Sequence, residues 1–462
     1  MGILFGTDGV RGVANSELGP ELAFKLGRAA AHVLSRRTGA KEIVVGRDTR
    51  ASGEMLEAAL VAGMLSTGVN ALLLGILPTP AVAYLSRALG AAGGVVISAS
   101  HNPAPDNGIK FFGGDGYKLP DAVEEEIEGL VLGGMTGIPS PVGSGIGRVL
   151  PVADAGDRYL AHVARVGPEE LRGLRIAVDC AHGAAYELAP RILSMLGAVV
   201  IPVGTEPDGF NINSGCGSTK PHALQELVFA TGADLGLAFD GDADRLIAVD
   251  EQGKIVNGDA IILACARYLK ARDELPGDTV VVTVMSNLGL HRALAASGIK
   301  TVVTRVGDRY VLEEMLRTGA RLGGEQSGHV IFLDHNTTGD GIITALKLLR
   351  VMRETGKSLG ELAAELEYYP QLLENVRVRS KERVLKSPLL ARVVQEQEAR
   401  LGSEGRVLVR ASGTEPLIRV MVEARDPEVT LEVVKELVAV IQAIEGGESE
   451  AGAAEELGLA TN

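Results

Sequence analysis

The chain has 462 residues, 46% of them hydrophobic and 23% charged, which is typical of a soluble globular protein with several domains. Its net charge of −14 argues against a general affinity for nucleic acid or for an anionic membrane, so local cationic groups must hold any anionic ligand. The three cysteines form no CxxC pair, and there is neither a signal peptide nor an apolar run long enough to span a bilayer. These features predict a cytoplasmic protein.

The first 150 residues alternate β-branched segments with amphipathic ones. Strands are predicted at 42–45, 71–74 and 94–98, and a helix is predicted from Pro20 to the Thr38-Gly39 pair. This alternation indicates α/β layers around a sheet. Residues 133–147 are rich in Gly, Pro and Ser, which predicts a linker and a first domain over residues 1–150.

The α/β pattern then restarts twice, which predicts further domains over residues 151–255 and 256–369. The expected strands are 175–179, 198–203, 235–239, 246–250, 279–284 and 300–304. After residue 369, strands at 375–379, 406–410 and 417–422 and a helix from Asp426-Pro427 to about Ile444 predict a smaller α+β domain over 370–445. Residues 446–462 are small and acidic, and a disordered tail is expected there.

Three carboxylates alternate along a short turn: Asp240, Asp242 and Asp244. Carboxylates in this arrangement can converge on one hard cation, which predicts a Mg²⁺ site. An EF-hand loop ending at Glu251 is the sharper alternative, but Arg245 stands where that loop needs Gly, and the flanking segments look like strands. A solvated acidic turn is the simpler alternative.

A serine-rich turn, residues 98–103, follows a predicted strand. The end of a strand in an α/β layer is a usual place for a reacting group, so Ser100 is a candidate to attack phosphorus or to carry a phosphoryl group. Lys110 could neutralise charge on that group. No G-x-S-x-G elbow is present, which disfavours a hydrolase triad. Taken alone, the segment could also be an ordinary polar turn.

Three further segments could bind parts of a phosphorylated sugar. Residues 410–419 combine hydroxyl groups, a Gly turn and two arginines, which suits a phosphate or else an ordinary turn between strands. Glu325 and Ser327 alternate and so face one way, which suits sugar hydroxyls, although a plain turn explains them equally well. The Gly-rich segment 5–12 carries Arg11, which could meet a phosphoryl group.

Together these motifs resemble those of the α-D-phosphohexomutase family, in that family's order and over nearly the whole chain. The resemblance implies three related α/β domains and a smaller C-terminal α+β domain around a central cleft. It implies that Ser100 is a phosphoserine that completes the Mg²⁺ site of Asp240, Asp242 and Asp244. It also implies the following roles: charge stabilisation by Arg11, Lys110 and Arg245; acid/base chemistry by His329; sugar binding by Glu325 and Ser327; and binding of the non-reacting phosphate by Arg410, Ser412, Gly413, Thr414 and Arg419.

Residues 5–12, residues 211–218 and Gln326 resemble the branch of the family that acts on glucosamine phosphates, as do residues 306–310, where many relatives have a nearby histidine. This branch interconverts glucosamine 6-phosphate and glucosamine 1-phosphate through glucosamine 1,6-bisphosphate, and it feeds amino-sugar nucleotide and cell-wall precursor synthesis. Mannose or glucose phosphate is the alternative substrate. A phosphosugar phosphatase and a calcium-binding module are alternatives from other classes. The expected partner is a small phosphosugar, and a homodimer is left open.

Overall fold

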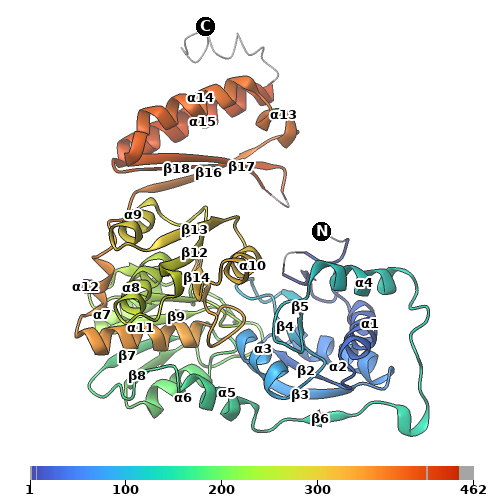
Figure 1. The fold of residues 1–462 in the computed structure, drawn as a ribbon. Helices are drawn as coiled ribbons and strands as arrows, with labels where there is room; N and C mark the ends of the chain where they lie inside the picture. Colours follow the sequence, from blue (N-terminus) through green and yellow to red (C-terminus); the bar gives the residue numbers. More distant parts are fainter. Residues whose placement is uncertain (1–2, 7, 413–414, 447–462) are drawn as a thin grey trace. The chain divides into compact units, whose positions relative to one another are not determined.

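The computed structural model describes residues 3–6, 8–412 and 415–446. The chain divides into two compact units, one of residues 1–285 with 294–365 and the other of residues 286–293 with 366–462. Within the described residues, the first unit contains three mixed sheets and the second unit contains one antiparallel sheet (Figure 1). No helix of the described residues is long and apolar enough to cross a membrane.

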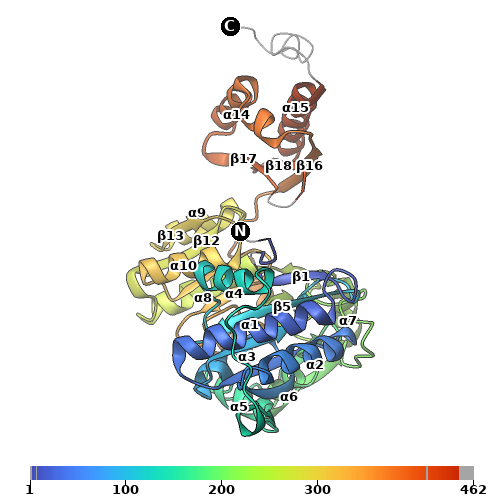
Figure 2. The ribbon, with the colours of Figure 1, turned by 90° about the vertical axis from the view of Figure 1, so that its right-hand side faces the viewer.

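The first sheet has the strand order β1-β5-β4-β2-β3-β6. Helices α1, α2 and α4 form a core on one side of this sheet (Figure 2), while α3 packs on the other side (Figure 1). The predicted helix from Pro20 is confirmed as α1, which has Pro at its first turn and ends where Gly39 adopts φ 79°. The elements are β1 (Val10–Val13), α1 (Pro20–Thr38), β2 (Glu42–Arg47), α2 (Ser52–Leu65), β3 (Asn70–Ile76), α3 (Thr79–Ala88), β4 (Gly93–Ile97), β5 (Asp106–Gly113), α4 (Asp121–Leu132), η1 (Gly143–Gly145) and β6 (Val149–Pro151).

The second sheet has the order β11-β10-β9-β7-β8, and the third has the order β13-β12-β14-β15. The second is built from α5 (Ala155–Val163), β7 (Arg175–Asp179), α6 (Leu188–Met195), β8 (Val199–Val203), α7 (His222–Thr231), β9 (Leu235–Phe239), β10 (Leu246–Val249) and β11 (Ile255–Val256). The third is built from α8 (Gly258–Ala271), η2 (Pro276–Asp278), β12 (Thr279–Thr283), β13 (Lys300–Thr304), α10 (Asp308–Thr318), β14 (Leu322–Gly324), β15 (Val330–Phe332), α11 (Gly341–Thr355) and α12 (Leu359–Ala363). Helix α9 (Leu288–Ala296) follows β12, and its residues 288–293 belong to the second unit.

One four-strand arrangement occurs in all three sheets. The first strand of each set lies between the second and the third and is parallel to both, and the fourth strand runs antiparallel beside the third. The sets are β2 to β5, β7 to β10 and β12 to β15, so the predicted repetition of related α/β units is confirmed. The turn from the third strand to the fourth carries Ser100 in the first set, Asp240 in the second and Glu325 in the third. These three candidate loops are therefore topologically equivalent.

The second unit has the sheet order β16-β18-β17, entirely antiparallel, with a hydrophobic core between the sheet and its helices. It confirms the predicted smaller α+β fold. The strand expected at 375–379 starts earlier, at Gln371, because residues 372–375 are exposed on an edge strand and show no apolar alternation. The elements are β16 (Gln371–Arg377), α13 (Lys381–Leu385), α14 (Pro388–Leu401), η3 (Gly402–Glu404), β17 (Gly405–Ala411), β18 (Leu417–Ala424) and α15 (Pro427–Gly446). The tail predicted from residue 446 lies outside the described residues from 447 onward.

Candidate active site

The serine turn and the acidic turn meet in the first unit. Ser100 follows β4, is buried, and adopts a left-handed backbone conformation with φ 51°. Its hydroxyl donates a hydrogen bond of 2.8 Å to Oδ2 of Asp240, which follows β9. Nδ1 of His101 lies 3.3 Å from the same hydroxyl. The structure therefore places the candidate nucleophile directly against the candidate metal site.

Asp240, Asp242 and Asp244 form a buried carboxylate cluster, and one ligand atom from each lies within 4.8 Å of the others. Burial, together with the neighbouring charges of Asp244 and Asp242, raises the pKa of Asp240 well above its usual value. One oxygen of Asp242 and one of Asp244 have no hydrogen-bond partner. Buried, repelling carboxylates with free oxygens are suited to a hard divalent cation such as Mg²⁺. The EF-hand alternative is wrong, because strands β9 and β10 flank the turn.

Three cations surround this cluster, and all three were predicted. Lys110 Nζ lies 2.8 Å from Asp242 Oδ2, and burial, which alone would lower its pKa, is outweighed by Asp242 and Asp8, so that its pKa is raised. Arg245 Nε lies 3.7 Å from Asp244 Oδ1 and 3.9 Å from Asp240 Oδ2. Arg11 pairs with Asp8. The site therefore carries permanent positive charge beside the buried carboxylates, where a phosphoryl group could be stabilised.

The third equivalent loop contributes His329 to this region. His329 is buried, with Nδ1 3.5 Å from Asp244 Oδ2, and its Nε2 accepts a hydrogen bond of 3.1 Å from the Gly339 amide. Burial alone would lower the pKa of His329, but the Asp244 carboxylate raises it. His329 contacts one member of the carboxylate cluster, and its acid/base role stays a prediction.

Glu325 and Ser327 lie in the same loop, and their side chains contact each other. Ser327 Oγ lies 3.5 Å from Glu325 Oε2, and Glu325 Oε1 accepts a hydrogen bond of 2.9 Å from the Gly307 amide. The carboxylate is thus held by the segment that precedes α10. Its remaining acceptor capacity could meet sugar hydroxyls.

Three charged residues that were not predicted as site residues lie beside the predicted ones. Asp8 accepts from Lys118 at 2.6 Å and lies 3.0 Å from Lys110, while Lys118 also donates to Asp308. Asp308 Oδ2 in turn lies 3.9 Å from Nε2 of His329. Asp8 sits inside the Gly-rich segment that was singled out and could have been found there. Asp308 likewise lies inside the segment 306–310 that resembles the family, whereas Lys118 carries no local signal, because its partnership with Asp308 depends on packing between segments 190 positions apart.

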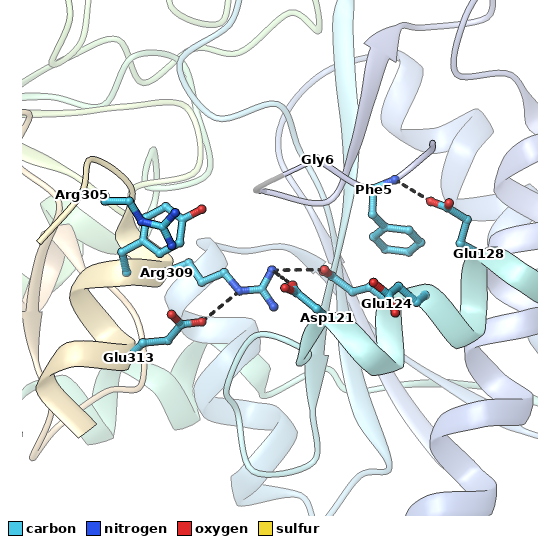
Figure 3. A pocket seen from close by; sticks show the side chains of 10 residues that line it. Phe5, Gly6, Asp121, Glu124, Glu128, Arg305, Arg309 and Glu313 are labelled. Atoms are coloured by element: carbon cyan, nitrogen blue, oxygen red, sulfur yellow. Dashed lines mark hydrogen bonds and ion pairs between the residues drawn. The ribbon is translucent and has the colours of Figure 1, made fainter. Parts of the chain in front are cut away.

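A separate pocket of about 300 Å³ is lined by none of the predicted site residues. Figure 3 shows Phe5, α4 and the start of α10 around it, with Arg309 reaching toward Asp121 and Glu124. Arg309 pairs with both carboxylates, and the Arg305 guanidinium lies over the Tyr310 ring, 3.9 Å from its centroid. These pairs tie α4 to α10, and the pocket belongs to that junction rather than to the carboxylate cluster.

In the second unit, described by itself, Arg410 and Arg419 stand directly opposite one another on β17 and β18. Burial and the charge of Arg419 lower the pKa of Arg410, and both Nε atoms lack a partner. Ser412 follows β17, and Lys381, which the sequence reasoning missed, donates to its carbonyl at 2.8 Å. Arg419 Nη2 also lies 3.5 Å from Oε2 of Glu415, and two adjacent cations beside one carboxylate still favour a bound anion. Gly413 and Thr414 lie outside the described residues.

Three equivalent α/β sheets, a serine beside a triple-carboxylate turn and an antiparallel C-terminal domain define the class of the phosphohexomutases. Models of the phosphoglucomutase/phosphomannomutase family match the chain in four parts: α/β/α domain I matches residues 2–135, domain II 157–253, domain III 257–369 and the C-terminal domain 373–440. The chain belongs to this family, which confirms the resemblance found in its motifs.

The chain is also similar over nearly its full length to individual family members. It is 62% identical to a phosphoglucosamine mutase of Desulforudis audaxviator, over 96% of this chain and 99% of that protein. It is 61% identical to a phosphoglucosamine mutase of Pelotomaculum thermopropionicum, over 96% of this chain and 100% of that protein. The crystal structure of a phosphoglucomutase/phosphomannomutase family protein from Burkholderia thailandensis superimposes with a TM-score of 0.81 at 25% identity, over 96% of this chain and 98% of that one.

Proposed function

We propose that this chain interconverts glucosamine 6-phosphate and glucosamine 1-phosphate by way of a phosphoserine at Ser100. The observation that carries the proposal is the 2.8 Å hydrogen bond from Ser100 Oγ to Asp240, within a cluster of three buried carboxylates. The amino-sugar substrate is supported by the phosphoglucosamine mutases that share 62% and 61% of their residues with this chain. Mannose or glucose phosphate is the competing substrate within the family.

In the proposed reaction, phosphate carried on Ser100 Oγ passes to the free hydroxyl of the sugar monophosphate. The P–O bond to Ser100 breaks as the P–O bond to the sugar forms, which gives glucosamine 1,6-bisphosphate. In the overall balance, the proton lost by the sugar hydroxyl is regained at Ser100 Oγ. Transfer of the other phosphate back to Ser100 releases the isomeric product. The cycle conserves phosphate, which distinguishes it from hydrolysis.

Asp240, Asp242 and Asp244 would hold Mg²⁺ together with an oxygen of the phosphoserine. When bound, the ion would neutralise charge on the transferring phosphoryl group. Arg11, Lys110 and Arg245 bring positive charge to the same place and would bind its remaining oxygens. Because these cations are held by Asp8, Asp242 and Asp244, little reorganisation is needed before transfer.

The remaining predicted residues would bind the parts of the substrate that do not react. Glu325 and Ser327 would accept and donate to sugar hydroxyls. The non-reacting phosphate would bind to the turn between β17 and β18, through Arg410, Ser412, Gly413, Thr414 and Arg419. Such an enzyme would work in the cytoplasm on a small phosphosugar and supply amino-sugar precursors. Whether it is a homodimer is left to measurement.

A substrate comparison tests the proposal. Intact-mass spectrometry of the purified chain should show one added phosphoryl group that maps to Ser100, and a coupled assay should give the highest kcat/KM for glucosamine 6-phosphate among the glucosamine, glucose and mannose phosphates. Ser100→Ala should lose at least about 10⁴-fold in kcat. Full activity of Ser100→Ala would rule out a phosphoserine mechanism at Ser100. A preference for mannose or glucose phosphate would rule out glucosamine phosphate as the substrate. Release of inorganic phosphate in step with turnover would indicate a phosphatase.

A further inference from the structure

Arg50 is fully buried, although arginine is among the residues least often found inside a protein. It lies just after β2 and forms an ion pair of 2.8 Å with Asp48, which is also fully buried. Burying a guanidinium is costly unless every donor is used. The hydrogen-bond partners of the Arg50 side chain therefore indicate its structural role.

The other Arg50 donors are directed at the main chain of the serine turn. Nη2 donates to the carbonyls of Ser100 at 3.0 Å and Asn102 at 2.8 Å. Nη1 donates to the carbonyls of Pro103 and Asp106, the latter at 3.0 Å. Four carbonyl oxygens from residues 100–106 thus converge on one planar cation, whose fork of donors lysine cannot reproduce.

A second side chain, from another part of the chain, donates hydrogen bonds to two of the same carbonyls. Asn213 Nδ2 donates to Ser100 O at 2.9 Å and to Asn102 O at 3.0 Å. Asn213 has φ 58° and lies in the segment between β8 and α7, which belongs to the second α/β repeat. The serine turn is therefore held from its own repeat and from the neighbouring one.

Among the equivalent positions of the three repeats, only the one beside the serine turn carries a guanidinium. Each first strand ends in the same turn, in which an oxygen of one side chain accepts from the amide two residues later: Asp48 from Arg50, Asp179 from Ala181, and Thr283 from Met285. Neither alanine nor methionine has a side-chain N–H. If the shared fold required a guanidinium at this position, all three repeats would have one. Arg50 is therefore required by the serine turn and not by the fold.

We infer that Arg50 and Asn213 are positioning residues for phosphoryl transfer: by holding the carbonyls of residues 100–106, they keep Ser100 in its left-handed conformation with its hydroxyl against Asp240. The inference deepens the proposed function and rests on it. Ser100 must return to one position after each transfer, because a displacement of about 1 Å can cost about 100-fold in rate. The serine would otherwise leave the left-handed region, which a non-Gly residue rarely occupies unless it is held there.

Arg50→Lys keeps the charge and removes the fork, and Arg47→Lys is its matched control. Arg47 ends the same strand, is mostly buried and pairs with Glu54 and Glu57. With glucosamine 1,6-bisphosphate as donor, the rate of phosphorylation of Ser100 and kcat should both fall about 100-fold in Arg50→Lys relative to Arg47→Lys. KM should stay within about threefold, since substrate-binding groups are untouched. Rates are normalised to the folded fraction, which removes the effect of lost stability.

Asn213→Gly is the second variant, and it tests the positioning role if Arg50→Lys does not fold. Glycine accepts the left-handed backbone, so only the amide is lost, and Asn15→Gly is the control because Asn15 also has a positive φ and is exposed. A fall of about tenfold in the rate of Ser100 phosphorylation is expected in Asn213→Gly alone. Rates within twofold of the controls in the folded variants would overturn the inference. No phosphorylation of Ser100 in the unaltered chain would instead overturn the proposed function.

Discussion

The hydroxyl oxygen of Ser100 lies 2.8 Å from Oδ2 of Asp240, although the two residues are 140 positions apart in the chain. Each lies in the turn between the third and fourth strands of its own repeat. A parallel strand followed by an antiparallel one leaves this turn at the carboxyl edge of the sheet, where reacting groups gather in α/β proteins. Two sheets of the same strand arrangement thus bring the candidate nucleophile to the candidate metal site, and each part of this arrangement can be tested.

Asp240→Asn should stabilise the metal-free protein and abolish its response to Mg²⁺. Folding raises the pKa of Asp240, so at pH values above the ordinary carboxyl pKa the folded protein binds more protons than the unfolded one. The free energy of unfolding therefore falls as pH rises. The amide has no charge to bury, so the Tm of Asp240→Asn in EDTA at pH 8 should exceed that of the unaltered chain. Calorimetry with and without Mg²⁺ measures both effects. A Mg²⁺-induced rise in Tm equal to that of the unaltered chain would contradict Asp240 as a ligand.

Lys118→Met should destabilise the first unit, because it leaves the Asp8 and Asp308 carboxylates close together without the cation that bridges them. A loss of about 1 to 3 kcal/mol is expected, seen as a lower Tm. Adding Asp308→Asn should recover part of that loss, since one of the two charges is then gone. Additive effects of the two substitutions would show that Lys118 and Asp308 are not coupled.

Arg419→Met should weaken substrate binding without lowering the stability of the second unit. Arg410 and Arg419 oppose each other across β17 and β18, and repulsion contributes to the lowered pKa of Arg410. Removing one charge relieves the repulsion but deletes donors to a phosphate, so KM should rise about tenfold or more. Arg379→Met, at a nearly fully exposed arginine of the same unit, is the control and should leave KM unchanged. An unchanged KM in Arg419→Met would place the phosphate site elsewhere.

His335 should make the protein less stable in mild acid. Burial, followed by the charge of Lys347, lowers the pKa of His335 to about 4, whereas the unfolded residue titrates near 6.5. Between these values the unfolded state binds more protons, so stability is complete above pH 6.5 and is lost as pH falls toward 4. His335→Gln should show a smaller drop in Tm between pH 7.5 and pH 5 than the unaltered chain. Equal drops would assign the acid sensitivity to other groups, such as His162, whose pKa burial also lowers.

The strands that could be predicted are those whose burial is visible in their residues. β2, β7 and β9 are short apolar or β-branched segments that end in polar turns, and they lie where they were expected. β16 was misplaced because five of its seven residues are exposed. β14 and β15 are three residues each and were not predicted, since two glycines in β14 carry no strand signal. Edge and very short strands are defined by pairing rather than by composition.

The residues of the candidate site also fall into those that a local pattern predicts and those that only packing reveals. Ser100 and the three aspartates could be found from the sequence because each has a local pattern that suits its chemistry. Arg50 could not, because an arginine after a strand has no local signal, and only packing shows that four carbonyls of residues 100–106 surround it. The cation pairs of Lys118 have the same origin.

The sequence alone therefore determined the chemical groups, their order along the chain and the α/β class, because residue type and periodicity are local properties. Only the tertiary structure decided which groups meet: Ser100 with Asp240, Asp244 with His329, and Arg50 with the serine turn. Their distances depend on how the repeats pack, which no spacing in the chain encodes. The charges of the site follow from that packing as well, since burial and neighbours, not residue type, shift the pKa values of Asp240 and Lys110.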